Sequence, residues 1–123
     1  MNVLLIESSE LLRERYTRIL SSVTEIKTLT IALNSKKSID IIKDNKPEAI
    51  IIAQELNSDT YKSIIIKIRA ICSEVIIIIL TSNPFSQMEK LGLKWGADYI
   101  LDKSSGFEEL PDLFKKFRTV NTF

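Results

Sequence analysis

Several polar side chains in this chain directly follow short apolar runs, and their types could form an ion pair with hydroxyls beside it. The members of this set are Glu7, Ser8, Gln54, Thr81, Ser82 and Lys103. A carboxylate and an ammonium group stabilise each other when both are withdrawn from water, and neighbouring hydroxyls can satisfy their remaining hydrogen bonds. Whether these side chains meet depends on the elements that carry them.

The composition excludes several other kinds of chemistry. The chain has no histidine, so it cannot build a serine–histidine or cysteine–histidine nucleophile, a histidine-ligated metal site or a phosphohistidine carrier. Its single cysteine, Cys72, excludes an internal disulfide and a thiolate metal cluster, and we expect it to be a small buried residue. The 17 basic and 16 acidic residues give a net charge of +1, so we expect no nucleic-acid partner.

No segment has the features of a targeting, membrane or nucleotide-binding sequence. No apolar run approaches the length that spans a bilayer, and the first residues lack a basic segment followed by a small-residue cleavage site. No glycine-rich loop follows the first apolar run, which argues against phosphate binding by a nucleotide there. We therefore expect a soluble cytoplasmic protein with no membrane partner.

Apolar runs alternate with amphipathic segments along the 123 residues, which we predict to form one domain, residues 1–123. Three of the runs are apolar throughout, as in strands covered on both faces, whereas the run at 26–31 alternates like an edge strand. The predicted strands are 3–6, 26–31, 49–53, 75–80 and 99–101. The predicted helices begin at Ser8 or Ser9, at Asn34 or Ser35, near Thr60, at Asn83-Pro84 and near Pro111. One turn with a capping box at Ser105 is expected before the last helix, because Pro111 cannot lie deep inside a helix.

Five strands that alternate with five helices predict an α/β fold: a doubly wound five-stranded parallel sheet with helices on both faces. The strand order expected for this pattern is 2-1-3-4-5. Ligands of such sheets bind beyond the carboxyl ends of the strands, at the point where the order reverses. All the polar residues named above follow strands, so we expect them to gather at this edge.

Four segments of the chain resemble the strands of response-regulator receiver domains, which have the flavodoxin-like fold. They are residues 3–9, 47–53, 78–82 and 96–104, and the last carries the most specific match, Gly96-Ala97-Asp98 followed by Lys103. In receivers, an aspartate after the third strand accepts a phosphoryl group beside a magnesium ion held by acidic residues. A hydroxyl residue and a lysine bind the phosphoryl oxygens.

The resemblance is incomplete at the residues that perform this chemistry. Thr81 and Lys103 match the hydroxyl residue and the lysine, and Glu7 matches the first acidic residue in charge only. Ser8 replaces the second acidic residue, and Ala53 replaces the phospho-accepting aspartate. A methyl group cannot attack phosphorus, and one carboxylate is a poor magnesium site. The sequence therefore predicts a pseudo-receiver in two-component-type signalling, with no enzymatic activity, no cofactor and no magnesium site.

Two alternatives stay open. An unconventional acceptor, Glu55 or Asp59, could keep the domain phosphorylatable, although Glu55 follows the strand by two residues and is expected to point into the loop. The chain could also be a flavodoxin-like small-molecule binder, because a fold does not fix a function.

In the pseudo-receiver, Lys103 lacks its usual aspartate, and Glu7 is the obvious substitute partner. The opposing expectation is that Lys103 extends to solvent and that Glu7 is hydrated. The position of the aromatic switch residue in receivers is occupied by Ile100, with Tyr99 on the opposite face, so we expect Thr81 to be a strand-end hydroxyl.

The fourth and fifth helices carry more apolar residues than one inward face needs. We expect a protein partner here, such as a signalling kinase or an output protein, or a homodimer through the fourth helix, fifth strand and fifth helix. The residues considered for this interaction face are Phe85, Met88, Tyr99, Phe114, Phe117 and Phe123, although Phe114 and Phe117 also fit core packing.

Overall fold

The computed structural model describes residues 1–82 and 87–120, without the side chains of 87, 88 and 118–120. Its strands are β1 (Asn2–Ile6), β2 (Thr28–Ala32), β3 (Ala49–Ile52), β4 (Ile76–Thr81) and β5 (Tyr99–Asp102). Its α-helices are α1 (Glu10–Leu20), α2 (Ser35–Asn45), α3 (Ser58–Ile71), α4 (Gln87–Trp95) and α5 (Leu110–Val120), and a short 3-10 helix, η1 (Gly106–Glu109), precedes α5. None of the helices in this described part is long and apolar enough to cross a membrane.

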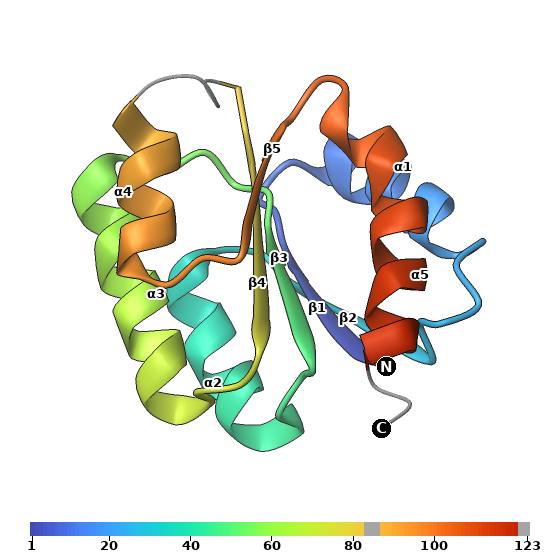
Figure 1. Cartoon of the computed structure of the whole chain (residues 1–123), viewed down its shortest axis with the longest axis horizontal. Helices are drawn as coiled ribbons and strands as arrows, with labels where there is room; N and C mark the ends of the chain where they lie inside the picture. The colour runs from blue at the N-terminus through green and yellow to red at the C-terminus, as the bar shows by residue number, and fades with distance from the viewer. Residues whose placement is uncertain (83–86, 121–123) are drawn as a thin grey trace.

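The strands form one parallel sheet in the order β2-β1-β3-β4-β5, as predicted. Helices α1 and α5 cover one face of the sheet, and α2, α3 and α4 cover the other (Figure 1). Because β1 and β3 are neighbours and are followed by helices on opposite faces, the order of the sheet reverses between them. The polar residues that follow the strands therefore share one edge of the sheet.

The three continuous apolar runs form the interior strands, and helices bury both of their faces. All four residues of β3 and residues 3–6 of β1 are at most 1% exposed. One hydrophobic cluster lies on the α1 and α5 side of the sheet and includes Tyr16, Leu20 and Phe114, and a second lies on the α2 to α4 side. The strand β2 is less buried, as an edge strand should be.

Side-chain caps fix where three of the helices begin. Ser9 caps α1, Asn34 caps α2 and Asn57 caps α3, each by accepting a hydrogen bond from the backbone N–H three residues later. The helix α3 begins at Ser58, earlier than the predicted start near Thr60, because Asn57 supplies this cap.

The capping box predicted at Ser105 is wrong, since its side chain makes no capping hydrogen bond. The single turn predicted before the last helix is confirmed: it is the 3-10 helix η1, and α5 then begins at Leu110 with Pro111 in its first turn. The predicted opening of the fourth helix at Asn83-Pro84 lies outside the described residues.

The Gly96-Ala97-Asp98 segment is tied to α3 by the guanidinium of Arg69. This group donates to the Gly96 carbonyl oxygen and to Asp98 Oδ2, the latter over 2.8 Å, and Asp98 Oδ2 also accepts from the backbone N–H of Ile77. Gly96 has a φ of +122°, and a Cβ there would lie 3.3 Å from Arg69 Nε. The positive φ favours glycine at this position, because L side chains rarely adopt it. The contacts hold the start of β5 beside β4.

Candidate functional site at the strand ends

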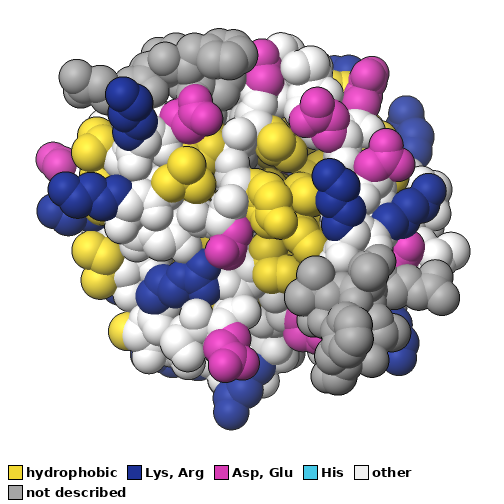
Figure 2. Space-filling model, viewed as in Figure 1, with side chains coloured by type: hydrophobic (Ala, Val, Ile, Leu, Met, Phe, Trp, Pro, Cys, Tyr) yellow, Lys and Arg dark blue, Asp and Glu magenta, His cyan; other side chains and the backbone are white. Residues whose placement is uncertain are grey.

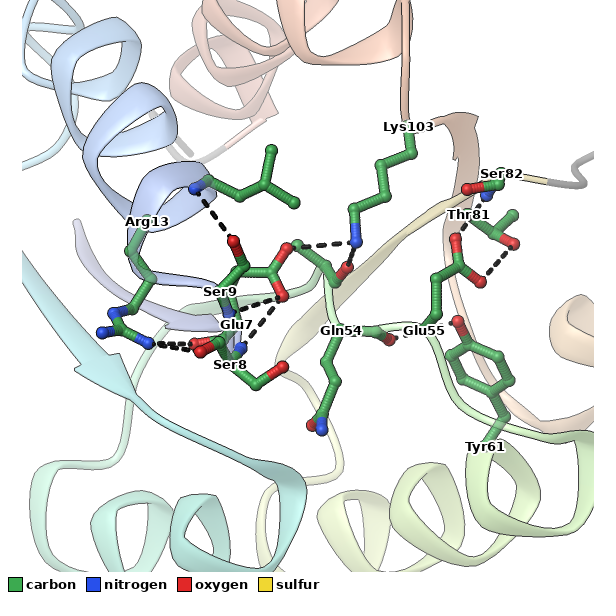
Figure 3. A network of polar contacts seen from close by, with 12 residues as sticks. Glu7, Ser8, Ser9, Arg13, Gln54, Glu55, Tyr61, Thr81, Ser82 and Lys103 are labelled. Atoms are coloured by element: carbon green, nitrogen blue, oxygen red, sulfur yellow. Dashed lines mark hydrogen bonds and ion pairs between the residues drawn. The ribbon is translucent and has the colours of Figure 1, made fainter.

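Glu7 and Lys103 form the ion pair that the sequence suggested. Lys103 Nζ lies 3.1 Å from Glu7 Oε1, and their side chains are 14% and 2% exposed, respectively. Glu7 Oε2 accepts a hydrogen bond from the Ser8 backbone N–H over 2.9 Å, with a longer contact to that of Ser9. Figure 3 shows the two side chains pointing toward each other from the ends of β1 and β5. The opposing expectation, a hydrated Glu7 and a lysine extended into solvent, is wrong.

The ammonium group of Lys103 has a second partner, the backbone carbonyl oxygen of Ala53. Ala53 is fully buried directly after β3, and its N–H donates to the Ile6 carbonyl. The methyl group of Ala53 brings no oxygen to the site. Lys103 is therefore held by a carboxylate and a carbonyl of its own chain.

Glu55 also reaches the strand ends, which corrects the expectation that it points into the loop. Its Oε1 accepts a hydrogen bond from the backbone N–H of Ser82, and its Oε2 lies 3.4 Å from the Thr81 hydroxyl, which donates to it. Figure 3 shows the carboxylate turned back from the loop after β3 toward the end of β4. The other proposed acceptor, Asp59, is exposed in the first turn of α3.

The residues around Glu55 anchor its loop at both ends. The Gln54 side chain accepts from the backbone N–H of Ser35, and the Gln54 carbonyl accepts from the Tyr61 hydroxyl over 3.2 Å. Tyr61 is buried, and this burial raises the pKa of its hydroxyl. Asn57 ends the loop by capping α3. Tyr61 was not predicted from the sequence as a residue of this site. The signal available was that a tyrosine on the buried face of a helix needs a hydrogen-bond partner for its hydroxyl.

The donor set does not fit a magnesium ion. The resemblance to receivers implies a site with two acidic side chains and a backbone carbonyl, but the residue that follows Glu7 is a serine, Ser8. Both oxygens of Glu7 and the carbonyl of Ala53 are engaged by Lys103 or by backbone N–H groups. Magnesium requires several oxygens in a near-octahedral arrangement, so it would have to displace an ammonium group that already neutralises this carboxylate.

A second charged network supports the first turn of α1. The Arg13 guanidinium donates to the carbonyl oxygens of Glu7 and Ser8. Tyr16, one turn further along α1, is 1% exposed. Burial, with the nearby Glu7 carboxylate as a smaller cause, raises the pKa of Tyr16 to about 12. The backbone around Glu7 is thus fixed from α1 as well as from the sheet.

Ile100 and Tyr99 lie on opposite faces of β5, as expected from the alternation of a strand. Ile100 packs with the cluster on the α2 to α4 side, and Tyr99 packs with the other cluster. The Tyr99 ring lies 5.6 Å from that of Phe117. Thr81 is buried and bonded at the end of β4, as a strand-end hydroxyl should be.

The expected interaction face needs a correction. Phe114 and Phe117 are 0% and 4% exposed because they are core residues of α5, so they cannot contribute to a surface. Hydrophobic side chains gather instead over β5, between α4 and α5 (Figure 2), where Tyr99 and Leu101 are half-buried. Phe85 and Phe123 lie outside the described residues, as does the side chain of Met88.

Known structures share this fold. A two-component response regulator from Clostridium difficile matches with a TM-score of 0.85 and 23% identity, covering 99% of each chain. The chain has the receiver-domain fold. The receiver domain of a sensor histidine kinase from Pseudomonas aeruginosa, solved with a magnesium ion in its active-site cleft, matches with a TM-score of 0.78 and 21% identity over 94% of both chains.

A further structure with this receiver fold is that of the RcsB receiver domain from Salmonella enterica serovar Typhimurium in the presence of the phosphomimetic BeF3⁻. It matches with a TM-score of 0.84 and 17% identity, covering 100% of this chain and 91% of that one. No family model matches the sequence, and no curated protein sequence matches it.

Proposed function

We propose that this chain is a receiver-like domain of two-component-type signalling that acts by binding proteins and is not phosphorylated on aspartate. The observation that carries the proposal is the position of Ala53, directly after β3, with its carbonyl bonded to Lys103. The side chain that should attack phosphorus is a methyl group. Signalling by such a domain then depends on the surface it presents.

The ion pair supports this proposal energetically. A phosphoryl group bound to Lys103 would have to compete with Glu7, which is buried and 3.1 Å from the ammonium group. Separating a buried ion pair leaves one charge without compensation, which costs about 3–5 kcal/mol. The resting arrangement is therefore favoured over one in which Lys103 turns to an added anion.

The surface over β5 between α4 and α5 is the place that we propose for the protein partner. Tyr99 and Leu101 are half-buried there. A signalling kinase, an output protein or a second copy of the chain could cover these apolar groups. Light scattering at increasing protein concentration distinguishes these partners. If the partner is a second copy, the average mass rises with concentration. If it is another protein, the chain alone stays a monomer.

Beryllofluoride with magnesium tests the loss of phosphorylation, because this complex imitates a phosphoryl group on an aspartate. Amide spectra of this chain should not change when both are added, apart from effects that magnesium alone produces. A receiver domain with aspartate at the position of Ala53 serves as the positive control. Saturable shifts at Thr81, Ser82 and Lys103 that require both reagents would contradict the proposal.

A second candidate function is phosphorylation of Glu55, which the orientation of its carboxylate favours. The group lies at the end of β4, bonded to Thr81 and Ser82. Transfer from acetyl phosphate would join the phosphorus to a Glu55 oxygen and release acetate. A phosphoryl adduct that disappears in Glu55→Gln but persists in Asp59→Asn would establish this function.

A further inference from the structure

Glu55 accepts hydrogen bonds from two donor groups that could equally bind a small oxyanion. A backbone N–H and a hydroxyl from consecutive residues, Ser82 and Thr81, converge on its two carboxylate oxygens. Hydrogen bonds to a charged acceptor are about twice as strong as those between neutral groups. Thr81 is 3% exposed, so its hydroxyl is directed by the fold and not by solvent. These donors recognise a charged oxygen acceptor, and the chain itself supplies one.

We propose that Glu55 is an internal ligand of this donor pair, and that its carboxylate excludes small external oxyanions such as inorganic phosphate from the end of β4. The inference rests on the proposed function in one respect, namely that no covalent phosphoryl group is added at this site. Glu55 then has two effects: it closes the loop after β3 against β4, and it keeps the site insensitive to anions in solution.

The anchoring of the loop explains why an external anion does not compete. Gln54 is fixed by its N–H bond to the Ile6 carbonyl and by its side-chain bond to Ser35, and Asn57 is fixed as the cap of α3. Only a short loop carries Glu55 between these anchors, so its carboxylate has a high effective concentration at the donors. Its negative charge also repels other anions.

A pocket beside the donors would admit an anion if Glu55 were removed. This pocket, of about 330 Å³, is lined by Ser82, Lys103, Ser104, Arg15, Leu12, Tyr16 and Phe107. Two of these residues are cationic and none is acidic. The Arg15 guanidinium lies 4.3 Å from the centre of the Phe107 ring, which holds this cation at the wall of the pocket. The charge of Lys103 is compensated by Glu7, so an oxyanion that reached Ser82 by this route would meet the positive charge of Arg15.

Titration with inorganic phosphate, followed by the amide resonances of Thr81 and Ser82, tests the inference. Glu55→Ala should show saturable shifts at these amides with at least tenfold higher affinity than the wild type. Asp59→Ala is the matched control, because it removes one exposed negative charge near the start of α3 without touching the donors. It should behave like the wild type. Equal affinity in the wild type and Glu55→Ala, or no saturable shift in either, would overturn the inference.

Two further variants guard against indirect effects. Glu55→Gln keeps the size of the side chain and removes its charge, so it should show a smaller gain in phosphate affinity even if Glu55→Ala loosens the loop. Adding Thr81→Val to Glu55→Ala should remove the gain, and a gain that persists would place the phosphate elsewhere and contradict the inference. A covalent adduct would contradict the proposed function, whereas a phosphate response independent of Glu55 would contradict only this inference.

Discussion

Glu7 and Lys103 face each other across the ends of β1 and β5, with 3.1 Å between Glu7 Oε1 and Lys103 Nζ. Among the described residues, Glu7 Oε1 has no hydrogen-bond partner, so the ammonium group is what compensates this buried oxygen. The pair lies at the carboxyl ends of the parallel strands. It ties the two strand ends together through charges that the chain itself provides.

Removing the ammonium group should destabilise the fold. Lys103→Met leaves the Glu7 carboxylate buried and uncompensated, and we expect the free energy of unfolding to fall by about 3 kcal/mol. Chemical denaturation measures this change. In the double variant with Glu7→Gln, no charge is left unpaired, so much of the stability should return. An unchanged or more stable Lys103→Met would show that the pair is not needed.

The Arg69 network should be a second determinant of stability, distant from the strand-end site. Arg69→Met leaves the carbonyl groups of Gly96 and Ser73 and the carboxylate of Asp98 without this donor, and should lower the free energy of unfolding by about 2–3 kcal/mol. Lys67→Met, at an exposed position on the same helix, should change it by less than about 0.5 kcal/mol. Equal effects of the two substitutions in denaturant titrations would show that the Arg69 hydrogen bonds do not stabilise the fold.

Gly106 should not tolerate a side chain. A Cβ at this position would lie 2.6 Å from Leu101 Cβ, so η1 or β5 would have to shift. We expect Gly106→Ala to lower the free energy of unfolding by about 1–3 kcal/mol. The neighbouring Ser105→Ala should have little effect, because the Ser105 side chain makes no capping bond. Comparable thermal midpoints for Gly106→Ala and the wild type would disprove the close contact.

Stability should fall in strong alkali because of Tyr16. Burial raises its pKa from 10.0 to about 12 in the folded chain, so the unfolded chain loses this proton first as the pH rises. The contribution of Tyr16 is complete below about pH 10 and is lost between pH 10 and 12. In Tyr16→Phe the decline should be shallower, although Tyr61, whose pKa is also raised, should retain part of it. Denaturant titrations at several pH values measure both slopes, and identical slopes would contradict the prediction.

Much of the fold could be predicted from the sequence because burial leaves a clear pattern in it. Continuous apolar runs marked the interior strands, and the alternation of strands with helices gave the parallel sheet and its order. Ser9 and Asn34 marked helix starts because their side chains form local bonds. The helix α3 begins before the predicted start near Thr60, because Asn57 caps it.

The site was predictable only where strand ends determine it. Glu7, Ala53 and Lys103 follow strands directly, so the sheet brings them together. Glu55 lies in a loop, and no periodicity fixes the direction of a loop side chain; its contacts with the end of β4 depend on tertiary structure. Phe117 looked available for a partner because helix α5 is rich in apolar residues, but the inward face is wide enough to bury it.

Intact-protein mass spectrometry after incubation with acetyl phosphate and magnesium is the most direct test of the account. We predict that the mass of the wild-type chain stays unchanged under conditions that fully modify a receiver domain carrying aspartate at the position of Ala53. A stoichiometric phosphoryl adduct on the wild-type chain, at Glu55 or any other carboxylate, would contradict the account.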